Sequence, residues 1–299
     1  MNTSDITKLA TERRNPRSRD IDRLTTAEMV SLINSEDKKV ADAVEKVCPQ
    51  IAAAIDLIYA RMKRGGRLIY CGCGTSGRLG ILDASECPPT YSVPPETVQA
   101  VIAGGKGAVF NAVEGAEDSA ELGKEDMLKL ALTENDTLVG IAASGRTPYV
   151  LGAMKAARDA GAGVIGLTCC PGSEIDRAAD IGISPDPGPE VITGSTRMKC
   201  GTAQKMVLNM LSTCTMVKLG KVYGNLMVDV KPSNEKLVHR CISIVREATG
   251  ADEKTAVAAL EACGYKCKTA IVMLLCSVSA DEAEARLGRS DGRVADAIR

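Results

Sequence analysis

A local pattern that occurs twice constrains the fold most: a short apolar run, a turn rich in glycine and hydroxyl residues, and then a helical pattern. The first copy contains Gly74-Thr75-Ser76-Gly77-Arg78 and the second contains Ser144-Gly145-Arg146-Thr147. A third turn, Thr193-Gly194-Ser195-Thr196-Arg197, also precedes a long helical stretch. Apolar runs that alternate with helices in this way predict a parallel sheet covered by helices on both faces.

The apolar runs predict five strands and the periodic segments predict the helices between them. The expected strands cover residues 68–71, 98–103, 137–142, 164–168 and 181–184. Helices are expected over 77–87, 148–160 and 196–219, the first ended by Pro88-Pro89. Upstream, Thr25 and Glu28 match a capping box. The apolar period from Val40 to Ile58 predicts one long helix that ends at Gly65-Gly66.

These patterns divide the chain into three parts. Residues 1–24 are expected to form an extended arm, residues 25–232 an α/β domain, and residues 233–299 a small helical, UBA-like domain. The last part shows one apolar helical stripe, followed by short helical patterns over 252–263, 266–278 and 280–288. This part either has a role of its own or only covers the sheet, and the pattern leaves both open.

Composition narrows the class of protein. The net charge of −1 gives no basic field for nucleic acid, and a single Phe with no Trp gives no stacking platform. The twelve cysteines lack paired C-x2-C spacing and the chain has one histidine, so we expect no metal site. The polar start and the lack of an apolar run of about 18 residues predict a reduced, cytoplasmic protein with no membrane partner.

The hydroxyl-rich turns predict an anion site. A strand-to-helix turn directs free backbone N–H groups outward, and the helix dipole favours negative charge there. Gly72-x-Gly74-x-x-Gly77 resembles a dinucleotide fingerprint, but no acidic residue ends the second predicted strand, and the P-loop pattern is absent. One such turn alone is more often ordinary capping, whereas three at one sheet edge favour a phosphorylated small molecule. Their arginines either bind the ligand or pair within the protein.

Two acidic clusters lie near the same predicted edge. One spans Asp83 to Glu86 and the other spans Glu114 to Asp118. Carboxyl groups in a closed site act as general acids or bases, whereas most acidic residues are simply solvated. Spacing alone does not show which carboxylates meet.

At these residues the chain resembles the N-acetylmuramic acid 6-phosphate etherases, a bacterial family of sugar isomerase (SIS) domain enzymes. The matching runs are 73–90, 112–118, 140–149, 193–205 and 224–230, together with Thr11-Glu12-Arg13-Arg14-Asn15 and Asn234-Glu235-Lys236. The likeness covers nearly the whole chain. Cys73 and Cys200 stand where alanine or glycine is expected, and neither replaces a polar group.

The resemblance implies a three-layer SIS sandwich with a five-stranded parallel sheet, a homodimer, and no metal or organic cofactor. It implies cleavage of the D-lactyl ether of N-acetylmuramic acid 6-phosphate to N-acetylglucosamine 6-phosphate and D-lactate in cell-wall sugar recycling. It assigns Glu86 as the general acid and Glu117 as the base. His239 is either a residue for sugar ring opening or an ordinary surface histidine. The residues expected to bind substrate are Thr75, Ser76, Gly77, Arg78, Ser144, Gly145, Arg146, Thr147, Ser195, Thr196 and Lys199.

Three alternatives remain beside this expectation. A ketose–aldose phosphate isomerase of the same domain class would share the phosphate site. A sensor similar to glucokinase regulatory protein would bind sugar phosphates without turnover, although that protein has two such domains and this chain has length for one. A transcriptional regulator is disfavoured, because no helix-turn-helix or basic patch is visible.

Overall fold

The computed structural model describes residues 10–111, 113–230, 232 and 234–299. Contacts divide the chain into two compact units. The first holds the chain up to Ser85 together with Glu96–Ser212, and the second holds Glu86–Pro95 with Thr213–Arg299. The predicted domain boundary at residue 232 stays a prediction, since the contact division falls elsewhere.

The first unit is built on a five-stranded, fully parallel sheet in the order β2-β1-β3-β4-β5. All five predicted strands are confirmed. Every residue of β1, β3 and β4 is buried, as a sheet covered on both faces requires. The strands are β1 Leu68–Gly72, β2 Val98–Ile102, β3 Thr137–Ile141, β4 Gly163–Leu167 and β5 Ile181–Ile183.

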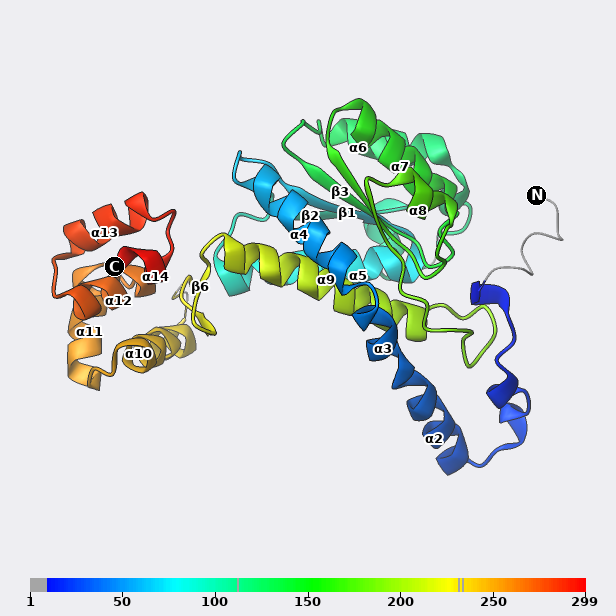
Figure 1. The fold of residues 1–299 in the computed structure, drawn as a ribbon, viewed down its shortest axis with the longest axis horizontal. Helices are drawn as coiled ribbons and strands as arrows, with labels where there is room; N and C mark the ends of the chain where they lie inside the picture. Colours follow the sequence, from blue (N-terminus) through cyan, green and yellow to red (C-terminus); the bar gives the residue numbers. More distant parts are fainter. Residues whose placement is uncertain (1–9, 112, 231, 233) are drawn as a thin grey trace. The chain divides into compact units, whose positions relative to one another are not determined.

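Helices cover the two faces of this sheet, which confirms the α/β sandwich (Figure 1). One face carries α6 (Ala120–Lys129), α7 (Pro148–Asp159) and α8 (Glu174–Ala178), and the other carries α4 (Cys48–Met62) and α5 (Gly74–Tyr91). Alternate strand residues such as Ile69, Leu138 and Val164 join α7 in one apolar cluster. Burial of these two apolar faces is the main force that holds the layers together.

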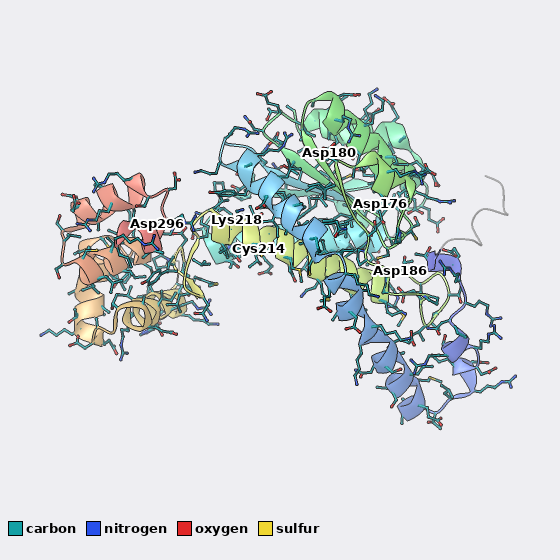
Figure 2. All side chains as sticks on the ribbon, viewed as in Figure 1. Asp176, Asp180, Asp186, Cys214, Lys218 and Asp296 are labelled. Atoms are coloured by element: carbon teal, nitrogen blue, oxygen red, sulfur yellow. The ribbon has the colours of Figure 1, made fainter. Side chains whose placement is uncertain are left out.

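Two aspartates secure the β5 edge of the sheet (Figure 2). The Asp180 carboxylate accepts a hydrogen bond from the Val164 N–H at 2.8 Å. Asp176 accepts one from the Ser184 hydroxyl at 2.7 Å. Both carboxylates therefore stabilise the short edge strand through hydrogen bonds.

The N-terminal segment differs from the expected extended arm. Three 3-10 turns, η1 (Ala10–Glu12), η2 (Pro16–Ser18) and η3 (Ile21–Arg23), lead into α2 (Thr26–Asp37). The first nine residues of the predicted arm lie outside the described residues. The predicted capping box is confirmed, since the Thr25 side chain accepts from the Glu28 N–H and Glu28 accepts from the Thr25 N–H.

Two helix predictions are wrong in their limits. The single long helix is divided into α2, α3 (Lys39–Glu45) and α4, and a proline at the start of α4 explains the second break because it has no N–H to continue the preceding helix. Conversely, α5 does not end at Pro88-Pro89 but continues to Tyr91. Each proline removes one i→i−4 hydrogen bond, but its φ fits a helix, and the helix ends at Tyr91, two residues after Pro89.

The second unit is mainly helical, as predicted. Its core gathers buried residues of the C-terminal helices, including Cys241, Val245, Leu260 and Ile271. Within the described part of the chain, none of the helices combines the length and the apolar character that crossing a bilayer requires. The elements are the hairpin β6 (Val222–Tyr223) and β7 (Leu226–Met227), α10 (Glu235–Thr249), α11 (Glu253–Ala262), α12 (Cys267–Cys276), α13 (Ala280–Arg289) and α14 (Val294–Ala297).

Candidate active site

A cavity of about 250 Å³ opens at the carboxyl edge of the sheet, where the chain leaves β1 and β3. The sheet order reverses between these two strands, and ligands of open α/β sheets bind at such switch points. The cavity, called the hydroxyl pocket below, brings together side chains from all three predicted turns. Its lining residues are Thr11, Glu12, Cys73, Gly74, Thr75, Ser76, Glu117, Ile141, Ala142, Ala143, Ser144, Thr147, Gly194 and Thr196.

The start of α5 supplies backbone donors to this pocket. The first N–H groups of a helix, here those of Gly74, Thr75 and Ser76, have no intrahelical acceptor. The Thr147 side chain precedes α7 without capping it. Its hydroxyl is therefore not committed to the helix end. These groups form a set of donors suited to an anion.

Gln204 lies behind Ser76, with 2.9 Å between its side-chain oxygen and the Ser76 hydroxyl. Its Nε2 is buried without a hydrogen-bond partner among the described residues. The Ser76 hydroxyl donates to Gln204 Oε1, so its proton is held by this bond.

The glycines of the two Ser-Gly-Arg turns serve the backbone. A Cβ on Gly77 would lie 2.6 Å from Ile102 Cγ1 of β2 and 2.7 Å from the Gly72 carbonyl oxygen of β1, so α5 could not approach these strands as closely. Gly145 has a φ of +68°, and a Cβ there would lie 2.0 Å from Ser173 Oγ. Neither Gly77 nor Gly145 is among the residues that line the pocket.

The third turn contributes less than expected. Thr196 and Gly194 line the pocket, whereas Ser195 and Lys199 do not. The first N–H groups of α9 (Lys199–Lys218) are already occupied, because the buried Glu190 accepts from the N–H groups of Lys199 and Cys200 at 3.0 and 2.9 Å. This helix start therefore has its own internal anion.

Lys199, expected to add charge for the phosphate, is held in a buried ion pair instead. Its ammonium is 3.0 Å from Glu36 and 2.8 Å from the carbonyl oxygen of Pro187. Glu36 also accepts from Asn15 and Arg17 of the N-terminal segment and from Lys39. Burial alone would raise the pKa of Glu36, but hydrogen bonds from Lys39, Lys199 and Asn15 lower it to about 2.

Glu117 is the predicted catalytic residue that meets the hydroxyls. It lies in η5 (Ala116–Asp118), its side chain is exposed, and it lines the pocket beside Cys73. Burial, and next the Glu117 carboxylate, raise the pKa of Cys73 to about 12. Cys73 is therefore a neutral thiol near neutral pH and not a nucleophile.

The other acidic cluster separates into two kinds of residue. Asp83 is buried and accepts from Tyr70, Asn209 and Ser212 at 2.8, 2.7 and 3.1 Å, which ties β1 and α9 to α5. Burial raises the pKa of Asp83. Glu86 is exposed on α5 and belongs to the second compact unit. Its pairing with Glu117 stays a prediction, as does a role for His239, which is exposed on α10.

The arginines of the turns do not line the hydroxyl pocket. Arg78 donates from Nε and Nη2 to the carbonyl oxygens of Val109 and Ala108, both at 2.8 Å. It thereby fixes η4 (Gly105–Val109), the turn that follows β2. Arg146 is partly exposed and lies outside the pocket lining.

Two residues of the N-terminal segment line the pocket without having been predicted there. Thr11 is 2% exposed, and its hydroxyl has no hydrogen-bond partner among the described residues. Glu12 is the next residue, and its Oε2 atom lies 3.3 Å from the position that a Cβ on Gly194 would occupy. The Thr11–Asn15 run was part of the resemblance, but local sequence gave no reason to bring it to the sheet edge.

Comparison with known proteins shows the family of the chain. The sequence is 55% identical over 298 residues to the N-acetylmuramic acid 6-phosphate etherase of Clostridium beijerinckii, covering 100% of this chain and 98% of that protein. The Serratia proteamaculans etherase is 57% identical over 290 residues, covering 97% of this chain and 98% of that protein. The chain belongs to the N-acetylmuramic acid 6-phosphate etherase family. This confirms the resemblance drawn from the turns and acidic runs.

Domain-level matches place this etherase family chain in the SIS fold. The model of the glucokinase regulatory protein N-terminal SIS domain matches residues 50–158, and the SIS domain model matches residues 112–213. A solved phosphoheptose isomerase from Neisseria gonorrhoeae aligns with a TM-score of 0.50 and 20% identity, covering 64% of this chain and 98% of that one. At that identity the likeness concerns the fold alone.

Proposed function

We propose that the protein cleaves the D-lactyl ether of N-acetylmuramic acid 6-phosphate with water, giving N-acetylglucosamine 6-phosphate and D-lactate. The observation that carries this proposal is the meeting of hydroxyl side chains and Glu117 in one cavity at the switch point of the sheet. The hydroxyls suit a phosphate, and the carboxylate suits proton transfer at the sugar. The family of the chain fixes which sugar phosphate we name.

The phosphate is the anchor of the substrate in this proposal. Backbone N–H groups at the start of α5 and the hydroxyls of Thr75, Ser144, Thr147 and Thr196 hold it. Binding energy from this remote group then positions the reacting carbons. Glu12 accepts hydrogen bonds from sugar hydroxyls, because a second anion is unsuited to contact with the phosphate.

The reaction proceeds by elimination and hydration. In the open-chain sugar the aldehyde at C1 makes the C2 proton acidic, and Glu117 removes it. Glu86 protonates the ether oxygen at C3, so that D-lactate leaves and a C2–C3 double bond forms. Water then adds at C3 with the proton returned to C2, which restores both carboxyl groups to their starting states.

An isotope experiment tests this proposal directly. Incubation with N-acetylmuramic acid 6-phosphate in ¹⁸O-water is expected to place ¹⁸O at C3 of the amino sugar and none in D-lactate, because lactate leaves with the ether oxygen. Mass spectrometry of both products reads this out. Label in lactate would contradict elimination, and tight sugar-phosphate binding without turnover would instead support a sensor.

Thr11→Val should weaken substrate binding without weakening the fold. The hydroxyl is buried and unpartnered in the described structure, so its loss removes no hydrogen bond within the protein. If it binds substrate, KM rises about 3- to 10-fold, as expected for one neutral hydrogen bond, and the thermal midpoint does not fall. Thr137→Val is the matched control. The buried Thr137 hydroxyl also has no partner among the described residues, but Thr137 does not line the hydroxyl pocket. An unchanged KM in Thr11→Val would remove Thr11 from the site.

We further infer a cytoplasmic homodimer, as the family resemblance implies. Phe110 and Val113 support it, since these apolar side chains are 87% and 45% exposed in the loop before Glu117. Light scattering of the purified protein measures the mass in solution, and a monomer mass would contradict the dimer.

A further inference from the structure

A second, smaller cavity of about 150 Å³ adjoins the hydroxyl pocket. The two cavities share Cys73, Gly74 and Glu117. A ligand whose reacting carbon lies at Glu117 can therefore extend into both. The remaining walls of the smaller cavity are Arg78, Ala103, Ala108, Val113 and Glu114.

Arg78 gives this smaller cavity a chemical character that the hydroxyl pocket lacks. Among the described residues that line either cavity, Arg78 is the only cation. Its two hydrogen bonds to carbonyl oxygens leave from Nε and Nη2. The N–H groups of Nη1 have no partner among the described residues, so the guanidinium is oriented on one side and available on the other.

The proposed substrate carries two anionic groups, and their order matches the order of the two cavities. The phosphate is at C6, and the lactyl carboxylate is attached through the ether at C3. Glu117, the base for the C2 proton, stands where the cavities join. With the phosphate in the hydroxyl pocket, the C3 substituent faces the smaller cavity.

We propose that the smaller cavity receives the lactyl group and that Arg78 binds its carboxylate. The inference rests on the proposed function, since it takes a 3-O-lactyl sugar phosphate as the substrate. Ala103 and Ala108 are 5% and 4% exposed and provide apolar contact for the lactyl methyl group. Glu114 and Glu117 would repel a third carboxylate, and the guanidinium offsets this repulsion by direct pairing.

This assignment makes Arg78 a specificity residue. A 3-O-alkyl sugar phosphate without the carboxylate would leave the guanidinium desolvated and unpaired, which costs binding energy. The hydroxyl pocket cannot make this distinction, because both compounds carry the same phosphate. The site would therefore select the lactyl ether through the smaller cavity.

The test compares two substrates with two enzymes. One substrate is N-acetylmuramic acid 6-phosphate, and the other is its lactamide analogue, in which the carboxylate is replaced by a carboxamide. Arg78→Gln is expected to lower kcat/KM for the carboxylate substrate about 10- to 100-fold, as for a charge-assisted hydrogen bond, with at most a small change for the amide. Arg78→Lys should restore part of the loss, because it keeps the charge without the planar fork.

Controls separate binding from loop support. Lys106→Gln removes an exposed positive charge from the same turn η4 and should leave the ratio between the two substrates unchanged. If Arg78 only fixes the Ala108 and Val109 carbonyls, Arg78→Gln lowers kcat/KM equally for both substrates, and the proposal is overturned. Calorimetric binding of N-acetylglucosamine 6-phosphate, which lacks the lactyl group, should persist in Arg78→Gln.

Failure of the proposed function gives a different result. If the unmodified enzyme releases neither lactate from the carboxylate substrate nor lactamide from its analogue, the etherase reaction itself is refuted. If it cleaves both ethers, releasing lactate from one and lactamide from the other, with the same kcat/KM, the reaction stands and the carboxylate assignment fails.

Discussion

Glu117→Gln is expected to lower lactate release by about 10²- to 10⁴-fold, the range that a positioned acid or base contributes. The variant keeps the size of the side chain and removes only its ability to take a proton. Glu117 is exposed within the pocket lining, so the change should leave the fold intact and sugar-phosphate binding measurable. Lactate release by a coupled assay and binding of N-acetylglucosamine 6-phosphate by calorimetry measure the two effects.

A deuterium experiment distinguishes the role of Glu117. In heavy water the unmodified enzyme should place deuterium at C2 of the amino sugar, because that proton is removed and replaced. Glu117→Gln should lose this exchange together with turnover. A variant that still exchanges the C2 proton but releases no lactate would show that Glu117 is the acid, not the base. Asp118→Asn is the matched control, since this neighbouring exposed carboxylate lines neither cavity and should keep most of the activity.

Lys199→Met should lower the free energy of unfolding by about 3–5 kcal/mol at pH 7, the cost of leaving a buried charge without its partner. Both side chains of the Lys199–Glu36 pair are 1% exposed. Methionine fills the space of the lysine stem but leaves Glu36 with less compensation. Chemical denaturation followed by circular dichroism measures the loss. KM should rise as well, because the same pair joins the segments that carry Thr11 and Thr196 to the pocket.

The pH dependence of this loss has a definite sign. The pKa of Glu36 is about 2 in the folded protein and about 4.3 in an unfolded chain, so its stabilisation is fully present above the unfolded value. It is lost as pH falls from about 4.5 towards 2. The difference between the protein and Lys199→Met should therefore be largest at neutral pH and narrow below about pH 4.5.

Lys39→Met is the matched control for this prediction. Lys39 contacts the same carboxylate at 2.6 Å, but its side chain is 49% exposed. Glu36 keeps Lys199, Arg17 and Asn15 in this variant, and water can reach the place of the half-exposed Lys39 ammonium, so the loss should be smaller than in Lys199→Met. Equal losses in the two variants would contradict the distinction between buried and exposed partners.

Local sequence was sufficient for the architecture of the sheet. Five apolar runs separated by helical patterns predicted the strands to within about a residue, because a strand buried on both faces needs a continuous apolar run. The limits of helices were less certain. The prolines predicted that the helix ends at Pro88-Pro89, but α5 continues to Tyr91. The break between α3 and α4 was not predicted. A proline removes one helix hydrogen bond but keeps a φ that a helix accepts, so local sequence alone does not decide where a helix ends.

The positions of the hydroxyl-rich turns could be predicted for the same local reason. Turn residues such as Gly77 and Gly145 are fixed by backbone approach, and the neighbouring serines and threonines therefore keep their places at the sheet edge. The three turns were predicted to lie together, and one residue of each, Thr75, Ser144 and Thr196, lines the same cavity. Lys199 shows the limit of this reasoning, because nothing near it in sequence reveals Glu36 as its partner.

By itself, the sequence determined the strands, the hydroxyl-rich turns and the family, since each depends on residues close together in the chain. Only the tertiary structure decided which side chains share a cavity. It brought Thr11 and Glu12 from the N-terminal segment to the sheet edge, withdrew Lys199 into a buried ion pair, and set Arg78 against a separate cavity. The physical reason is that burial and charge pairing act between residues far apart in sequence, and no local pattern records those distances.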